Sequence, residues 1–392
     1  MSRGSLAELA LVAGKLGVIG FGGPAAHVAM LRTEVVERRD WLSDGEFLEL
    51  LGATSALPGP GSTQMVMAVG RRRCGWRGLL VAGACFIAPA TAIVLGLAWL
   101  YVAYGREPAV GGVLYGIKPV VVAVIVVSLW GLVRSVARSG RVPLATAVAA
   151  LGAFLAGVDP LVVLGAGAVV VSGWDNRTRL RPVQALVPLV PAAVLGRPAG
   201  APGAPGGVVA DPAHRAGALH VGLWPLVREF AKLGVIVFGS GYVLLAFLQR
   251  DLVHQLHWLG ARQLLDAVAA GQVTPGPVFT TATFVGYLVA GVPGGLLATA
   301  AIFAPSFLMV AVLVPVLPRL RRSPWTAGVL DGVAAAALGL MAAVTVPLGR
   351  TAFVDPLTVV VAAGALVVLA RWRPNTAWVV LAGGVVGALH SL

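Results

Sequence analysis

The stretch Lys15–Gly22 reads KLGVIGFG, and 217 residues later the stretch Lys232–Gly239 reads KLGVIVFG, with seven of the eight positions identical. The same offset relates two Pro-Gly-Pro motifs, Pro58-Gly59-Pro60 and Pro275-Gly276-Pro277. The chain therefore contains an internal duplication. An apolar chain that is duplicated, and that Gly and Pro interrupt at matching positions, is typical of secondary transporters built from two repeats.

The composition is that of a membrane protein. Apolar residues make up 58% of the 392 residues and charged residues only 11%, whereas soluble domains have about half and a quarter. Apolar runs such as 79–104 and 111–133 reach the ~20 residues that cross ~30 Å of hydrocarbon. Because no alternating barrel pattern appears, we expect an all-α polytopic protein of the cytoplasmic (inner) membrane.

The net charge of +13 resides largely in short arginine-rich loops. Such loops usually face the cytoplasm, so the charge indicates orientation rather than a nucleic-acid surface. The basic loop at 71–77 matches an uncharged segment at 290–294, and the neutral loop at 105–108 matches a basic one at 319–322. If basic loops stay inside, the two repeats are inverted relative to each other.

The duplication also predicts the domain boundaries. We expect an N-terminal repeat at 1–196, a Pro- and Gly-rich linker at 197–220 and a C-terminal repeat at 221–392. The motif Val-Asp-Pro-Leu recurs with an offset of 196 rather than 217. The second half therefore lacks about one helix of the first.

Four Gly- and Pro-rich breaks interrupt the apolar segments. They are Phe21-Gly22-Gly23-Pro24, Pro58-Gly59-Pro60, Phe238-Gly239-Ser240-Gly241 and Thr274-Pro275-Gly276-Pro277. Gly and Pro do not continue a regular helix comfortably, and non-helical backbone at membrane depth occurs only where protein or a wet cavity receives it. We expect the broken helices to meet near the bilayer midplane.

A helix that restarts after such a break presents free N–H groups and the positive end of its dipole, which suits an anion. Neutral donors follow both Pro-Gly-Pro motifs: Ser62, Thr63 and Gln64 after the first, and Thr280 after the second. We predict a substrate-binding site for an anion at these breaks. The alternative is helix packing through small residues and proline kinks.

Only three of the 29 basic residues are lysines, and all three lie in or beside apolar segments. Lys15 and Lys232 are repeat mates that precede a Gly-rich break, and we predict that they bind the anion. Lys118 is a secondary candidate. The alternative for each is a lysine that extends from a helix end toward the membrane surface.

Three further residues are candidates for proton transfer or binding. Glu49 and Asp266 are repeat mates, each nine residues before a Pro-Gly-Pro proline, and either carries a coupling proton or caps a half-helix. His27 follows the first break and either titrates near neutral pH or forms hydrogen bonds between helices. No metal-ligand spacing, nucleotide-binding loop or nucleophile–base constellation is present, so we expect no catalytic residue, metal or cofactor.

These residues resemble the chromate ion transporter family, in its long form with two homologous domains. The resemblance covers roughly 5–140 and 221–350 and rests on Phe21–His27, Glu37–Leu42, Leu57–Gln64, Tyr115–Pro119, Phe238–Leu244, Thr274–Phe284 and Ile302–Phe307. It implies a secondary active exporter of chromate that confers chromate resistance, with sulfate as a look-alike dianion. It also implies an oxyanion and membrane lipid as partners, with a homodimer as one option.

Three other functions remain open at this level. An uptake symporter for sulfate or another oxyanion would use the same site with opposite coupling, and a passive anion channel would not accumulate its substrate. A membrane-embedded enzyme is disfavoured because the sequence lacks an acidic metal motif and a nucleophile–base pair.

Overall fold

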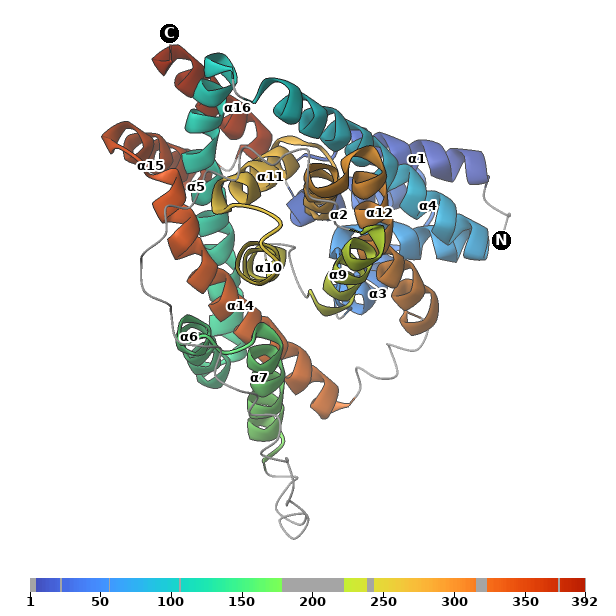
Figure 1. The fold of residues 1–392 in the computed structure, drawn as a ribbon. Coiled ribbons are helices and arrows are strands. Elements are labelled where there is room, and N and C mark those ends of the chain that lie inside the picture. The colour runs from blue at the N-terminus through green and yellow to red at the C-terminus, as the bar shows by residue number, and fades with distance from the viewer. Residues whose placement is uncertain are drawn as a thin grey trace.

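The computed structural model describes residues 5–21, 23–55, 57–105, 107–177, 222–237, 243–314, 323–372 and 374–391, and these ranges form helices and connecting turns without a β-strand (Figure 1). Four helical segments are long and apolar enough to cross a membrane: Gly61–Tyr104, Val110–Ser139, Val278–Leu313 and Pro324–Ala352. The prediction of an all-α, multi-pass membrane protein is confirmed. The predicted linker at 197–220 lies outside the described residues, so the domain boundaries stay predictions.

The described part of the first repeat contains seven α-helices and one π-helical turn. They are α1 (Leu6–Ile19), α2 (Gly23–Arg32), η1 (Thr33–Arg38), α3 (Asp44–Ser55), α4 (Gly61–Tyr104), α5 (Pro108–Ser139), α6 (Arg141–Leu155) and α7 (Pro160–Asp175). Within α4 the chain turns sharply at Cys74 and Gly75, where the helical dihedral angles are lost.

The second repeat follows the same order from α9 onward. Its described elements are α9 (Leu223–Ile236), α10 (Val243–Leu248), η4 (Gln249–Gln255), α11 (Ala261–Val273), η5 (Val278–Thr280), α12 (Thr281–Leu313), α14 (Pro324–Ala352), α15 (Pro356–Arg371) and α16 (Thr376–His390). The π-helical turn recurs as η4, and the sharp turn of α4 recurs at Ala290 and Gly291 in α12. Because α14 leads directly to α15, the structure confirms that the helix matching α6 is missing.

Each repeat folds its broken segments into helical hairpins. In the first hairpin α1 runs antiparallel to α2 and η1, so that Lys15 contacts Glu34 and Glu8 contacts Arg39. In the next, α3 runs antiparallel to the beginning of α4, and Arg72 near the open end contacts Glu46. The two Pro-Gly-Pro breaks form tips, between α3 and α4 and between α11 and α12. They are turning points of the chain rather than kinks within single spans.

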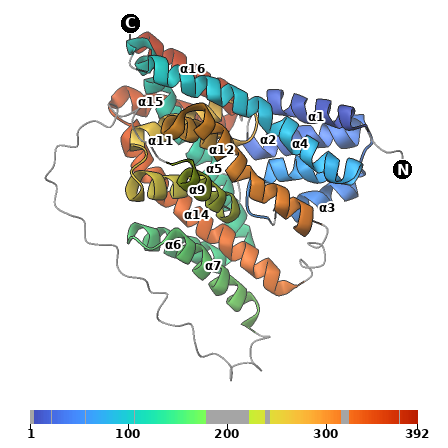
Figure 2. The same cartoon turned by 45° about the vertical axis from the view of Figure 1, so that its right-hand side comes forward.

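The two repeats run in opposite directions through the bundle. Gly83 of α4 lies against Phe307 of α12, and Leu95 of α4 lies against Gly295 of α12, so these equivalent helices are antiparallel. Both views show α4 and α12 side by side (Figures 1 and 2). The glycines allow the two backbones to approach closely, as is usual in membrane helix packing. The predicted inversion of the repeats is confirmed for this central helix pair.

Candidate functional site

The breaks of the two repeats meet in one place. The N–H of Gly59 donates to the carbonyl of Val237 at 2.6 Å, and the N–H of Gly276 donates to the carbonyl of Gly20 at 2.7 Å. The 217-residue offset relates Gly59 to Gly276 and also Gly20 to Val237. Each Pro-Gly-Pro tip therefore closes on the end of the first helix of the opposite repeat. We call the two Pro-Gly-Pro tips and these two helix ends the break cluster.

Only glycine fits at the centre of each Pro-Gly-Pro motif. Gly59 has φ of 110° and Gly276 has φ of 95°, a conformation that other residues adopt only with strain. A Cβ on Gly59 would lie 2.5 Å from Ser306 Oγ, and a Cβ on Gly276 would lie 2.8 Å from Ala90 Cβ. Ala90 and Ser306 occupy matching positions on α4 and α12, so the two tips use the same geometry.

The helices that follow the motifs begin at the break cluster. Pro60 is the N-cap of α4, and the next residues Ser62, Thr63 and Gln64 are only 3%, 0% and 0% exposed. Pro277 leads into η5 and then α12, and the hydroxyl of Thr280 donates to the carbonyl of Pro277 at 2.8 Å. The structure thus directs two helix N-termini, with their unpaired N–H groups, toward the cluster.

Three buried polar atoms near the cluster lack a hydrogen-bond partner among the described residues. They are the hydroxyl of Thr63, Oε1 of Gln64 and Nε2 of Gln272. Buried polar atoms are nearly always paired, so unpaired ones indicate a ligand or water. Thr63 and Gln272 can donate to an oxyanion, whereas Oε1 of Gln64 accepts. The sequence does not single out Gln272, although it lies two residues before the break Thr274-Pro275-Gly276-Pro277.

His27 holds the first break through two hydrogen bonds. Its Nε2 lies 2.7 Å from the carbonyl of Gly20, and its Nδ1 lies 3.2 Å from the hydroxyl of Ser62. The Gly20 carbonyl requires that Nε2 donates, whereas the hydroxyl of Ser62 can donate to Nδ1 or accept from it. The same Gly20 carbonyl accepts the N–H of Gly276. His27 therefore forms hydrogen bonds between helices, which is the second of the two roles weighed from the sequence.

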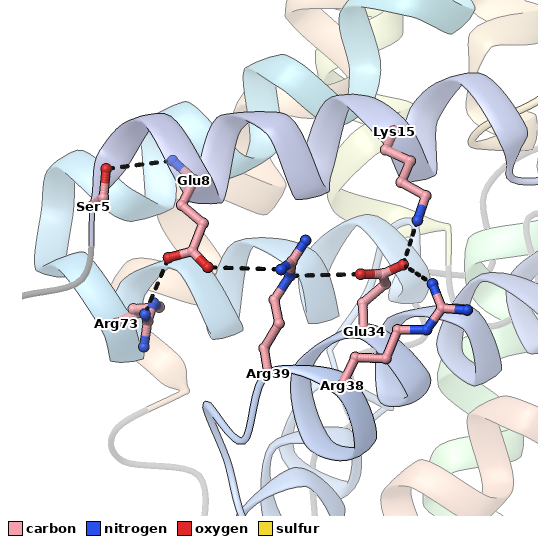
Figure 3. A network of polar contacts seen from close by, with 7 residues as sticks. All are labelled: Ser5, Glu8, Lys15, Glu34, Arg38, Arg39 and Arg73. Atoms are coloured by element: carbon pink, nitrogen blue, oxygen red, sulfur yellow. Dashed lines mark hydrogen bonds and ion pairs between the residues drawn. The ribbon is translucent and has the colours of Figure 1, made fainter.

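Lys15 and Lys232 have equivalent carboxylate partners. Lys15 Nζ lies 2.5 Å from Glu34 (Figure 3), and Lys232 Nζ lies 2.7 Å from Asp251. Glu34 and Asp251 are repeat mates, each 19 residues after its lysine. In the described structure both lysines join the two sides of a hairpin, and their ion-pair partners are carboxylates rather than break residues. The sequence does not single out these carboxylates, although the same 217-residue offset relates them.

Each lysine belongs to a larger ionic cluster. Around Lys15, Glu34 also contacts Arg38 and Arg39, and Glu8 bridges Arg39 and Arg73, which gives four cations and two carboxylates (Figure 3). Around Lys232 lie one further cation, Arg250, and three carboxylates, Glu229, Asp251 and Asp159. The first-hairpin cluster has an excess of positive charge and the second-hairpin cluster an excess of negative charge.

The remaining predicted residues are dispersed. Glu49 is exposed on α3, whereas its repeat mate Asp266 is 4% exposed and lies 2.9 Å from Lys118 of the opposite repeat. Thr274 is buried and its hydroxyl bonds the carbonyl of Ala270 within α11. Gly23 and Pro24 begin α2. Gly22, Gly239, Ser240 and Gly241 lie outside the described residues.

Inverted helical repeats whose broken helices meet inside a membrane-crossing bundle define a two-repeat, transporter-like membrane protein. The chain belongs to the chromate transporter family: the family model described as "Chromate transporter" matches residues 7–172 and 224–388, one segment in each repeat. The resemblance stated from the sequence motifs is thereby confirmed.

Three relatives named as chromate transport proteins match nearly the whole chain. The chain is 31% identical to a probable chromate transport protein of Synechococcus elongatus, over 94% of this chain and 90% of the relative. It is 29% identical to a chromate transport protein of Cupriavidus metallidurans, over 97% and 91%. It is 31% identical to a chromate transport protein of Pseudomonas aeruginosa, over 96% and 90%. No solved structure matches the chain.

Proposed function

We propose that the chain is a secondary active transporter that exports chromate across the cytoplasmic membrane and thereby confers chromate resistance. The observation that carries this proposal is the break cluster, where reciprocal hydrogen bonds from Gly59 and Gly276 join the two inverted repeats. Two helix N-termini and unpaired buried donors converge there. The relatives are named transport proteins, so the proposal treats the chain as a transporter and not as an enzyme.

The oxyanion would be held by neutral donors and helix dipoles. The carbonyls of Gly20 and Val237, at the ends of α1 and α9, are already paired with the opposite tips. The first-turn N–H groups of α4, the hydroxyl of Thr63 and the amide of Gln272 suit a tetrahedral oxyanion. Gln64 donates to the carbonyl of Pro58 at 2.5 Å and to Ser306 at 3.3 Å, and it shapes the tip instead.

Lys15 and Lys232 take a different role from the one predicted. Since each is paired with a carboxylate across its hairpin, we propose that they position the tips and do not ligate the anion in this conformation. The positive excess of the first-hairpin cluster would attract the anion to the face where that hairpin opens. The arginine-rich loops predict that this face is cytoplasmic.

The membrane potential is sufficient to drive such export. Moving a dianion out of an inside-negative cell gains ~4.6 kcal/mol per 100 mV, at ~2.3 kcal/mol per charge. This corresponds to roughly three decades in concentration ratio. The proposed mechanism therefore needs no ATP.

The test is uptake of labelled chromate into inverted membrane vesicles, with and without an inside-positive potential and excess sulfate. The proposal expects potential-driven accumulation that sulfate reduces. Equilibration without accumulation would indicate a channel, and uptake of sulfate alone would indicate another oxyanion transporter. Either result would overturn chromate export.

A pair of matched variants tests the site itself. Thr63→Val removes an unpaired donor, and the loss of a hydrogen bond to a charged ligand is expected to raise KM for chromate roughly 10- to 100-fold. Thr146→Val is the control, because the hydroxyl of Thr146 is already bonded to the carbonyl of Val142 within α6. An unchanged KM in Thr63→Val would remove Thr63 from the site.

A further inference from the structure

One buried ion pair joins the second repeat to the first. Asp266 on α11 has a side chain 4% exposed, and its Oδ1 lies 2.9 Å from Nζ of Lys118 on α5. The hydroxyl of Tyr101 on α4 donates to Oδ2 of Asp266 at 3.0 Å. Both direct partners of this second-repeat carboxylate therefore belong to the first repeat.

The other groups around Asp266 do not compete for it. Arg262, about one turn earlier on α11, is the remaining described ionisable group that acts on this carboxylate. Five other elements pack against α11, and in the described chain none brings a further charge to Asp266; they are α12, α14, α16, η4 and η5. The site therefore consists of one carboxylate, one close ammonium and one phenol.

This pair occurs in only one of the two matching places. The repeat mate of Asp266 is Glu49, which is exposed on α3. By the offset of 216 residues that relates Gly75 to Gly291, the repeat mate of Lys118 is Ala334, which has no charge. A buried ion pair is not needed for stability, since well-packed apolar residues often serve as well or better. An ionisable pair kept at a single site inside a membrane protein therefore indicates function.

A cavity lies beside Asp266 and Tyr101 and extends toward one end of the bundle. It has a volume of about 470 Å³, and its wall includes Asp266, Tyr101, Tyr104, Val110 and Val273. Tyr104 and Val110 flank the loop at 105–107, which the charge pattern predicts to lie outside the cell. Val273 directly precedes Thr274 of the second Pro-Gly-Pro tip. The wall is otherwise largely apolar, and the carboxylate of Asp266 and the phenol of Tyr101 are groups that can bind a water molecule in it.

We propose that Asp266 is a proton-binding site and that the transported oxyanion moves together with this proton. A proton from the cytoplasmic water binds a carboxylate oxygen of Asp266, where one O–H bond forms, and it leaves to the outside through the cavity. Binding neutralises Asp266 and leaves the ammonium of Lys118 uncompensated. The inference rests on the proposed function, because it assigns the coupling ion of that same transporter.

Electrostatics determines the direction of this coupling. Asp266 precedes Thr274 by eight residues, or about 12 Å of helix. At that distance an uncompensated cation strengthens the binding of a dianion on the order of tenfold or more, at the effective dielectric constant of proteins. Proton and oxyanion therefore favour each other's binding. One chromate dianion leaves with one proton, so the transported unit carries a single negative charge, and the membrane potential contributes half of the driving force given above for a dianion that moves alone.

The experiment measures steady-state chromate accumulation in inverted vesicles at a fixed potential, while the pH of the outer medium, which is the cytoplasmic face, is lowered by one unit. Wild-type protein should accumulate about tenfold more chromate per unit, as one coupled proton requires. Asp266→Asn should show no such gain and should respond to potential with two charges per chromate. Glu49→Gln is the matched control and should behave as wild type. The pH also changes the protonation of chromate in solution, but this effect is the same for all variants and cancels when their accumulation is compared.

The outcomes separate this inference from the proposed function. If wild-type protein accumulates chromate under a potential but shows no larger pH response than Asp266→Asn, proton coupling through Asp266 is overturned and export stands. If Asp266→Asn is absent from the membrane, Asp266→Asn with Lys118→Gln replaces it, because neither charge is then left unpaired. That double variant should transport with weaker affinity and without pH response. A pH response retained in it would also overturn the proposal.

Discussion

The two repeats share a backbone path but not their chemistry. Both have a positive-φ glycine in the Pro-Gly-Pro tip, a sharp turn at a glycine with φ of 63°, and a lysine paired with a carboxylate 19 residues later. They differ in the side chains around these features. His27 and Ser62 hold the first break, whereas Leu244 and Phe279 occupy the matching positions of the second. The comparison shows that backbone geometry was kept in duplicate, while polar chemistry was concentrated at the first break.

The ionic clusters show the same divergence. The first-hairpin cluster has more cations than carboxylates, and the second-hairpin cluster has more carboxylates than cations. Since the repeats are inverted, matching hairpins face opposite sides of the membrane, and each side has its own potential and loop charge. Identical side chains in the two hairpins would therefore lie in different electrostatic surroundings on the two sides of the membrane.

Substitution of Gly59 or Gly276 should have the largest effect on chromate uptake, and this effect should be equal in the two repeats. Gly59→Ala and Gly276→Ala each place a Cβ into a filled space at positive φ, a strain of roughly 1–2 kcal/mol added to about 1–3 kcal/mol of overpacking. Chromate uptake should be lost in both variants.

Gly61→Ala is the control for these variants, because nothing lies within 4 Å of a Cβ there. Uptake by inverted vesicles, corrected for protein amount, measures the effect. Normal uptake in one tip variant alone would show that only one tip belongs to the site.

Replacement of His27 should sharpen the difference between the breaks. His27→Leu gives the first break the side chain that the second has at Leu244, and it leaves the buried hydroxyl of Ser62 without its partner. An unsatisfied buried group costs about 1–3 kcal/mol, so the midpoint of unfolding in detergent should fall. Leu244→Ile is the control at the matching position. An unchanged midpoint in His27→Leu would contradict the role assigned to the ring.

Removal of Lys15 and removal of Lys232 should lower the stability of the protein by different amounts. In Lys15→Ala, Glu34 keeps Arg38 and Arg39. In Lys232→Ala, the cation that Asp251 keeps among the described residues is Arg250 at 4.0 Å. Since both lysines are partly exposed, the difference should be small. We expect Lys232→Ala to lower the free energy of unfolding by about 1 kcal/mol more than Lys15→Ala does. Chemical unfolding of both variants measures this difference, and a larger loss in Lys15→Ala would reverse the comparison.

Lys15→Ala should also lose transport while it stays in the membrane. The reason is that the ion pair between Lys15 and Glu34, which joins α1 to η1, is lost. Unchanged export by this variant would remove Lys15 from the transport machinery.

The smallest expected effect is a pH dependence confined to the first repeat. Glu46 caps α3 by accepting from Ser43, and these hydrogen bonds together with Arg72 lower the pKa of Glu46 from 4.5 to about 2. Its contribution to stability is present above pH ~4.5 and is lost as the pH falls through about 2. The second repeat has Gln263 at the matching position, which accepts from Gly260 at 2.9 Å without titrating.

Glu46→Gln should therefore flatten the acid side of the stability profile slightly, as thermal unfolding between pH 5 and pH 2 would show. Asp44→Asn is the control on the same helix turn. A profile that Asp44→Asn alters as much as Glu46→Gln would assign the effect to general surface charge.

The sequence predicts the breaks well and their partners poorly. Gly59 and Gly276 were identifiable because Pro and Gly act on their own backbone, whatever surrounds them. Glu34 and Asp251 were not, because pairing between residues far apart in sequence has no local signal. Gln272 was not identifiable either, because the sequence does not show that its amide is buried without a partner. Lys15 was expected beside the anion for its charge alone, and only the fold shows the carboxylate beside it.

The sequence by itself determined the membrane location, the duplication, the inverted orientation and the positions of the four breaks. These follow from hydropathy, internal identity and loop charge, which are additive along the chain. Only the tertiary structure decided that each tip bonds the opposite repeat, that the lysines are neutralised and that Asp266 rather than Glu49 is buried. Those facts depend on which surfaces meet, and two repeats related by inversion place matching residues in different surroundings.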